Sequence, residues 1–164
     1  MNRELQGAKR DSGLSPGPLL AEEVHTGRLW AVVLFVPVVA ELAVLAAIPN
    51  AATRLAMGLV ALILLGASAL AWSGFHYLFT EAGLEIRTLG FRLRSIPTEH
   101  IKAYAVDHWT PVGGYGIRGI GDKRAYVWGN KGVRIHTTDG EVFLGHNEPE
   151  RIVQDLDLIR QFSH

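Results

Sequence analysis

Two long apolar stretches in the first half of the chain constrain its fold more than any other feature. Residues 29–48 contain one charged side chain, Glu41, and residues 55–75 contain none. About 20 apolar residues in a helix cross the hydrocarbon core of a bilayer, which is about 30 Å thick. The connection between the stretches is short, so the two helices must lie antiparallel and side by side. The sequence therefore predicts a membrane hairpin with spans at residues 29–48 and 55–76.

Two other interpretations of these stretches are less favourable. A buried helical hairpin in a soluble protein would need a covering layer, because neither stretch has a polar face and the chain has only 164 residues. A signal peptide fits poorly because the preceding segment is long and acidic and a second apolar stretch follows. Basic residues precede the first span and follow the second, whereas the connection holds only Arg54. This asymmetry predicts that both termini face the cytoplasm.

Two residues of the first stretch are unusual at membrane depth. Pro37 removes a backbone donor and predicts a kink. Ionisable side chains in a membrane normally face a partner or a transport pathway, which makes Glu41 a candidate intramembrane polar site. Its partner could be Ser68, Thr53 or Arg54, or it could be a second copy of the chain. The alternative is a carboxyl group that is protonated or reaches the far interface.

The chain on either side of the hairpin divides into a tail and a domain. Residues 1–27 are the predicted tail, whose first 18 residues are rich in Gly, Ser and Pro and predict disorder. Residues 19–26 within it could form an interfacial helical turn or a short strand that pairs with the domain. Residues 28–77 are the predicted membrane part, and residues 78–164 are the predicted cytoplasmic domain.

The pattern of this domain predicts a mainly-β fold closed by one helix. Between residues 78 and 146, apolar and polar side chains alternate in short runs separated by turns, which is typical of antiparallel strands. Asp139-Gly140 predicts a tight hairpin turn. Residues 148–160 repeat apolar side chains with the helical period. We therefore predict one antiparallel β-roll capped by a C-terminal helix.

The two spans followed by residues 77–101, YLFTEAGLEIRTLGFRLRSIPTEHI, give the chain a family resemblance. It resembles the bacterial pleckstrin-homology-like (PH-like) membrane proteins, in which similar strands around glycine turns open a cytoplasmic PH-like roll. Residues 113–140 are also similar to small two-helix actinobacterial membrane proteins of unknown function. The resemblance covers about residues 29–162. It implies a PH-like fold, the bacterial plasma membrane and a binding or scaffolding role, and it supplies no site residues.

Composition and motifs argue against an enzyme. The chain has no cysteine, which removes disulfides, cysteine–zinc sites and thiol nucleophiles. Sixteen basic and sixteen acidic residues cancel, which is not typical of a nucleic-acid-binding protein. Seven scattered histidines lack metal-binding spacing. Residues 114–119 match G-x-G-x-x-G, but the helix that a dinucleotide site needs does not follow. We expect no catalytic residue, no metal and no cofactor.

The glycine-rich segment 109–123 is the predicted binding surface. Its candidate contact residues are Trp109, Tyr115, Arg118, Lys123 and Arg124. The aromatic side chains could anchor a partner protein or dip toward the bilayer, and the basic ones could contact anionic lipid headgroups. The alternative is that the same apolar groups fold back onto the sheet.

These patterns lead to one prediction of function and two alternatives. The first is a non-enzymatic protein integral to the lipid bilayer of the inner membrane, whose PH-like domain binds a protein partner or the membrane face. The second is a small subunit of a membrane transport or export complex that uses Glu41 and Pro37. An enzyme is third. A homo-oligomer is compatible with all three, and nucleic acid is not an expected partner.

Overall fold

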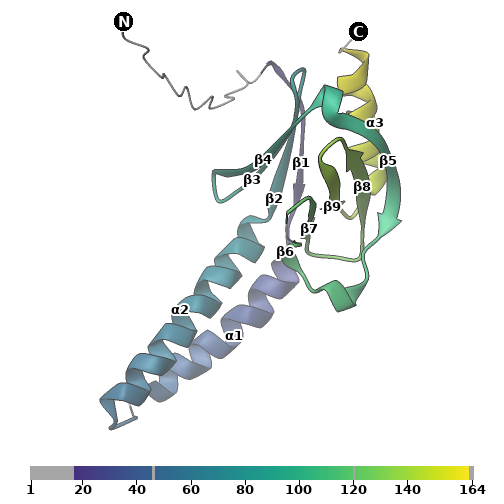
Figure 1. The fold of residues 1–164 in the computed structure, drawn as a ribbon. Coiled ribbons are helices and arrows are strands. Elements are labelled where there is room, and N and C mark those ends of the chain that lie inside the picture. Colours follow the sequence, from purple (N-terminus) through teal and green to yellow (C-terminus); the bar gives the residue numbers. More distant parts are fainter. Residues whose placement is uncertain (1–16, 46, 120, 163–164) are drawn as a thin grey trace, which may run out of the picture.

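A pair of antiparallel helices projects from a β domain that is covered by one further helix (Figure 1). This computed structural model describes residues 17–45, 47–119 and 121–162. Helix α1 is Arg28–Leu45 and helix α2 is Ala51–Ser73. The disorder predicted for residues 1–16 lies outside the described residues.

Small side chains bring α1 and α2 together. The buried residues of the pair are Ala31, Val38, Ala61, Ser68 and Ala71. The Ser68 hydroxyl donates a hydrogen bond to the backbone oxygen of Ala31 at 2.8 Å. Pro37 lies within α1 and does not end it. Close backbone approach at small residues is typical of helices that pack in membranes.

Most of the surface of the two helices is apolar and exposed. Exposed large side chains include Leu29, Val36, Leu55, Leu62, Ile63 and Trp72. Both helices are long and apolar enough to cross a membrane. Soluble proteins rarely expose contiguous apolar surface of this extent, which disfavours the buried-core interpretation.

The ends of α2 differ from the predicted span and have local causes. The Asn50 side chain accepts hydrogen bonds from two backbone amides of the first turn, at 2.9 and 3.2 Å, and this N-cap starts the helix at Ala51. The helix ends before Gly74, whose φ is +72°. Residues 75–77, which the sequence pattern suggested as the end of the membrane part, instead belong to a strand.

The first sheet contains a strand that the sequence interpretation placed in the tail. Its strands are β1 (Leu19–His25), β2 (Phe75–Thr80), β3 (Gly83–Thr88) and β4 (Phe91–Pro97), antiparallel in that order. His25 pairs with Phe75, because the antiparallel hairpin brings the chain entering α1 beside the chain leaving α2. Of the two alternatives for residues 19–26, the strand is therefore the one that forms, and in sequence the helical hairpin lies between the two paired strands β1 and β2.

The second sheet contains one parallel pair. Its strands are β5 (Ile101–His108), β6 (Gly116–Arg118), β7 (Lys123–Val127), β8 (Lys131–Thr137) and β9 (Gly140–Gly145), in the order β5-β8-β9-β7-β6. The predicted hairpin forms between β8 and β9, but its two turn residues are Thr138 and Asp139, and Gly140 is the first residue of β9. This hairpin folds back so that β9 lies between β8 and β7 and runs parallel to β7. The prediction of a single antiparallel roll is wrong in this respect.

The core lies between the two sheets and is covered by helix α3 (Pro149–Gln161). The predicted C-terminal helix is confirmed, and it buries Ile152, Leu156 and Ile159. The buried hydroxyl of Tyr77 donates to the backbone oxygens of Tyr126 at 3.1 Å and Gly145 at 3.0 Å, which ties β2 to the second sheet. Two short 3-10 turns complete the domain, η1 (Thr98–His100) and η2 (Pro111–Gly113).

Candidate functional site

The predicted binding segment 109–123 runs from the end of β5 through η2 and β6 to β7. Strand β6 is an edge of the second sheet. Figure 1 places η2 and β6 at the end of the β domain from which the helices leave. The turn after β6 requires glycine, because Gly119 has a φ of +90° and a Cβ there would lie 2.0 Å from the backbone oxygen of Lys123. The first part of the segment, up to Gly116, therefore lies beside the helical hairpin, whereas Lys123 pairs with Glu141 at the other end of the sheet.

Trp109 folds back onto the sheet. Its indole Nε1 donates to the backbone oxygen of Gly114 at 2.8 Å, and its ring lies 5.3 Å from that of Phe143 between ring centroids. Together with Ala125 and Val127, these side chains form a small cluster on the outer face of the second sheet. This is the folded-back arrangement that the sequence left open, so Trp109 stabilises the segment and does not project from it.

Tyr115 attaches the segment to the helical hairpin. Its ring lies 4.9 Å from the ring of Trp30, in the first turn of α1. The backbone oxygen of Tyr115 also accepts a hydrogen bond from Arg118 Nε at 2.7 Å. Tyr115 is one of the predicted contact residues, and Trp30 lies at the start of the first predicted span. Their contact fixes the glycine-rich segment at the start of α1.

Four of the five predicted contact residues line one hollow on the outer face of the second sheet. The hollow has a volume of about 170 Å³, and its lining includes Trp109, Arg118, Lys123, Arg124, Arg134, Glu141 and Phe143. Tyr115 is not among the lining residues. The last three residues come from β8 and β9, so they could be added only when the sheet order was known.

Arg124 borders the hollow, but its side chain points to the other face of the sheet. It lies two residues from Tyr126, so the alternation of a strand points both side chains toward the core side of β7. Burial raises the pKa of Tyr126, while the charges of Arg94 and Arg124 act in the opposite direction. The charge of Arg124 is thus directed at the Tyr126 phenol, away from the hollow.

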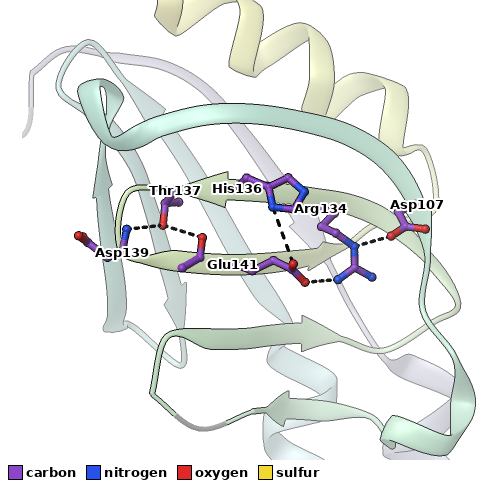
Figure 2. Close-up of polar contacts among 7 residues, drawn as sticks. Asp107, Arg134, His136, Thr137, Asp139 and Glu141 are labelled. Carbon is purple, nitrogen blue, oxygen red and sulfur yellow. Dashed lines mark hydrogen bonds and ion pairs between the residues drawn. The ribbon is translucent and has the colours of Figure 1, made fainter.

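Arg134 is neutralised by carboxylates on both neighbouring strands (Figure 2). Its guanidinium donates to Asp107 on β5 and to Glu141 on β9, and the ring of His136 lies 3.8 Å from the other oxygen of Glu141. The hydrogen bond from Arg134 lowers the pKa of Asp107. Burial lowers the pKa of Arg134, but the bonds to both carboxylates outweigh it and raise that pKa. Two carboxylates surround the single guanidinium of Arg134, so one negative charge remains there beside the positive charges of Arg118 and Lys123.

The turn between β3 and β4 was not among the predicted sites. Its Leu89 amide donates to the Ser73 hydroxyl at 3.1 Å, and the Thr88 hydroxyl donates to the backbone oxygen of Gly74 at 2.7 Å. Leu89 has a φ of +49°, unusual for a branched residue. Leu89 and Phe91 are nevertheless exposed. The apolar triplet Leu89-Gly90-Phe91 in a tight turn is the sequence signal that could have identified this contact.

A buried histidine pair joins β1 to the end of β9. His25 is 2% exposed, and its Nε2 accepts a hydrogen bond from the Trp128 amide at 3.3 Å. Burial, and secondly the charge of His146, lowers the pKa of His25 to about 4. His146 in turn lies 3.3 Å from Glu23, which also pairs with Arg151 at 2.9 Å. These contacts hold β1 in the domain.

Glu41 is half-buried on α1, far along the hairpin from the β domain. Two of its predicted partners are otherwise engaged, because Ser68 bonds to Ala31 and Arg54 lies 3.4 Å from the Pro49 oxygen. Within residues 17–45, 47–119 and 121–162, Glu41 forms no ion pair. The same part of the chain contains no group of three His, Asp or Glu side chains that could hold a metal ion.

No protein-family model, no curated protein and no solved structure matches the chain.

Proposed function

We propose that this chain is a non-enzymatic, membrane-anchored binding module. Its hairpin crosses the bilayer of a bacterial inner membrane twice, with both termini in the cytoplasm. Its β domain rests on the cytoplasmic membrane face. Of the two partners expected from the sequence, the membrane face is favoured over a protein. Two attachments support this choice. The apolar β3–β4 turn is bonded to the end of α2, and the glycine-rich segment, with its η2 turn, contacts the start of α1.

The position of these turns relative to the bilayer follows from the length of α2. Its 23 residues extend about 35 Å at 1.5 Å per residue, slightly more than the hydrocarbon core of about 30 Å. Ser73 therefore lies at the membrane surface, and so does Leu89, which is bonded to it. Trp30 and Tyr115 lie together at the start of α1, where amphipathic aromatic rings favour the headgroup level.

Exposed apolar side chains extend from both turns. Val112, in η2, is 99% exposed, and Phe91, at the start of β4, is 72% exposed. In water these side chains would cost free energy, whereas at a bilayer surface they would be buried. Arg118, whose Nε donates to the backbone oxygen of Tyr115, would meet anionic headgroups at about 1 kcal/mol, whereas Lys123 lies opposite Glu141 at the far end of the sheet.

The PH-like fold is part of this proposal. Two packed sheets and a C-terminal helix support it. The parallel β7–β9 pair and the origin of β1 before the hairpin are the features that depart from the simple roll. The transport alternative depends on Glu41 and Pro37 alone, and no contact of either residue in the described chain favours it.

The absence of cysteine allows a direct test with a single label in the full chain. We would place a fluorescent bimane on Val112→Cys, reconstitute the protein in vesicles and measure quenching by lipids with nitroxides at the headgroup. Thr138→Cys is the control, because Thr138 is exposed at the opposite end of the second sheet, beside His100. The glycine-rich segment leaves β5 beside the start of β8, and Thr138 follows the end of β8. The seven residues of β8 separate these two ends by about 23 Å.

We expect strong quenching at residue 112 and weak quenching at residue 138. Equal, weak quenching at the two positions would show that the β domain stands off the membrane, and the proposed function would be wrong.

A further inference from the structure

An apolar groove lies between α1 and α2 directly beside the β3–β4 turn. Its volume is about 540 Å³, within the range of small-molecule sites in proteins. Buried Ala31 and Ser68 form its floor, exposed Phe35 and Trp72 form its rims, and Leu89 closes it on the side of the β domain. The groove opens at the level where the proposed function places the headgroups.

The groove has no polar group that requires a polar ligand. The Ser68 hydroxyl is satisfied by the backbone oxygen of Ala31, and the Ser73 hydroxyl accepts from the Leu89 amide. The remaining lining consists of apolar side chains. Such a surface suits an alkyl chain, which offers no hydrogen bonds of its own.

Two arginines stand directly behind the turn that closes the groove. Arg87 on β3 and Arg92 on β4 are partners across the strand ladder, so their like charges lie side by side. Both approach a single carboxylate, that of Glu85: Arg87 at 2.7 Å and Arg92 at 3.5 Å. One positive charge of the pair therefore remains uncompensated. Arg92 is the more weakly paired of the two, because its contact is longer and its side chain is 52% exposed.

One further carboxylate lies near the pair, that of Glu22 on β1. It forms a 2.9 Å hydrogen bond with His76, which lies opposite Arg87 on β2, and within the described residues it forms no ion pair with Arg87 or Arg92. The two arginines are therefore the cations that could meet an anionic ligand beside the groove.

We propose that the groove and the arginine pair together bind one anionic phospholipid. An acyl chain lies in the groove beside Trp72, and the phosphate contacts Arg92 and Arg87 beyond Leu89. This inference rests on the proposed crossing of the membrane by α1 and α2. A second copy of the chain could cover the apolar groove as well, but it would leave the paired arginines without an anion.

The test uses Trp72 as a reporter in the full chain. We would reconstitute the protein in phosphatidylcholine vesicles with a small fraction of either phosphatidylglycerol or phosphatidylcholine brominated on the acyl chain. Bromine quenches tryptophan on contact. We expect about a fivefold preference for the anionic lipid, which corresponds to about 1 kcal/mol for one basic group. Trp72→Phe should remove the difference and so assign it to this groove.

Two variants separate the headgroup contact from the chain contact. Arg92→Gln should bring the preference for the anionic lipid close to one. Ala69→Phe, which fills the groove from an exposed helix position, should reduce quenching by both lipids. Lys102→Gln, which removes an exposed charge on β5, is the matched control and should change neither value.

Three outcomes would overturn the inference. Equal quenching by the two lipids would mean that the groove holds bulk lipid only. A full preference in Arg92→Gln would mean that the arginine pair does not bind the headgroup. Weak quenching by both lipids, together with disulfide formation between two Ala69→Cys chains, would identify a second copy as the occupant. A quenched label at residue 112 with no lipid preference would leave the proposed function intact and reject only this site.

Discussion

The β domain is attached to the hairpin on two sides, by different kinds of contact. On the side of α2, the β3–β4 turn is held by hydrogen bonds to Ser73 and Gly74. On the side of α1, the glycine-rich segment is held by the ring contact of Tyr115 with Trp30. Hydrogen bonds have a narrow geometry, whereas aromatic contacts tolerate a range of angles. We infer that the α2 side sets the angle of the domain and the α1 side allows it to adjust to the membrane.

A substitution at Gly74, where the β domain joins the end of α2, should produce the largest loss of stability. Gly74 has a φ of +72°, and a Cβ there would lie 2.4 Å from the backbone oxygen of His25. Because strain and clash add, Gly74→Ala should reduce the free energy of unfolding by about 3 kcal/mol or more. Thermal unfolding of the full chain in detergent measures this loss.

Gly90→Ala is the matched control for that substitution. Gly90 has a φ of +80°, but a Cβ there would meet no atom within 4 Å. Strain alone predicts a loss of about 1 kcal/mol. Equal losses in the two variants would contradict the assignment of Gly74 as the fixed joint.

Lowering the pH tests the strand that leads into α1. The pKa of His25 is lowered from 6.5 to about 4, first by burial and then by His146. Below pH 6.5 the unfolded chain binds a proton at His25, whereas the folded chain binds it only near pH 4. Stability is therefore complete above pH 6.5 and falls as the pH is lowered toward 4, by up to about 3 kcal/mol. Unfolding temperatures measured across this range should show the decline.

His25→Gln removes the titrating group and should flatten that profile. The amide oxygen of glutamine can accept the hydrogen bond that Trp128 now donates to His25. If the variant kept the full decline between pH 6.5 and 4, another group would be responsible.

Removing the hydrogen bond between Thr88 and Gly74 tests the attachment on the side of α2 without changing the glycine. Thr88→Val should destabilise the chain by about 2 kcal/mol, because the buried backbone oxygen of Gly74 loses its donor. Hydrogen exchange should become faster in the β3–β4 turn. Thr138→Val, at an exposed turn, should cost about 0.5 kcal/mol or less. The idea fails if the two valine variants are equally stable.

The smallest effect is expected on the α1 side. Tyr115→Ala removes the ring contact with Trp30 and should cost about 1 kcal/mol. Amide exchange should become faster in residues 112–118 and remain unchanged in the β3–β4 turn. A larger loss than that of Thr88→Val would reverse the proposed roles of the two sides.

The elements predicted best from sequence are those specified by many neighbouring residues. The two helices of the hairpin and α3 follow from long apolar or periodic runs. Strand β1 was one of two alternatives for residues 19–26, and the sequence could not choose it because its partner β2 lies some fifty residues away. The parallel β7–β9 pair was missed for a related reason: a strand pattern identifies a strand but not its neighbour.

In the candidate site too, residues close in sequence could be predicted together, whereas residues brought together by the sheet order could not. Arg118, Lys123 and Trp109 are close in sequence and do lie around one hollow. Arg134 and Glu141 reach it only through the sheet order. The contact of Leu89 with Ser73 depends on where α2 ends, and the apolar pattern continues past that point into β2. Only the φ of Gly74 sets the boundary.

The central claim is that both turns touch the membrane together. We would attach nitroxide labels at Phe91→Cys, Val112→Cys and Thr138→Cys in the full chain and measure by spin resonance their accessibility to oxygen and to a water-soluble nickel complex in vesicles. The account predicts that the labels at residues 91 and 112 favour oxygen, at one shallow depth, while the label at residue 138 favours nickel. Nickel accessibility at residues 91 and 112 equal to that at residue 138 would contradict it.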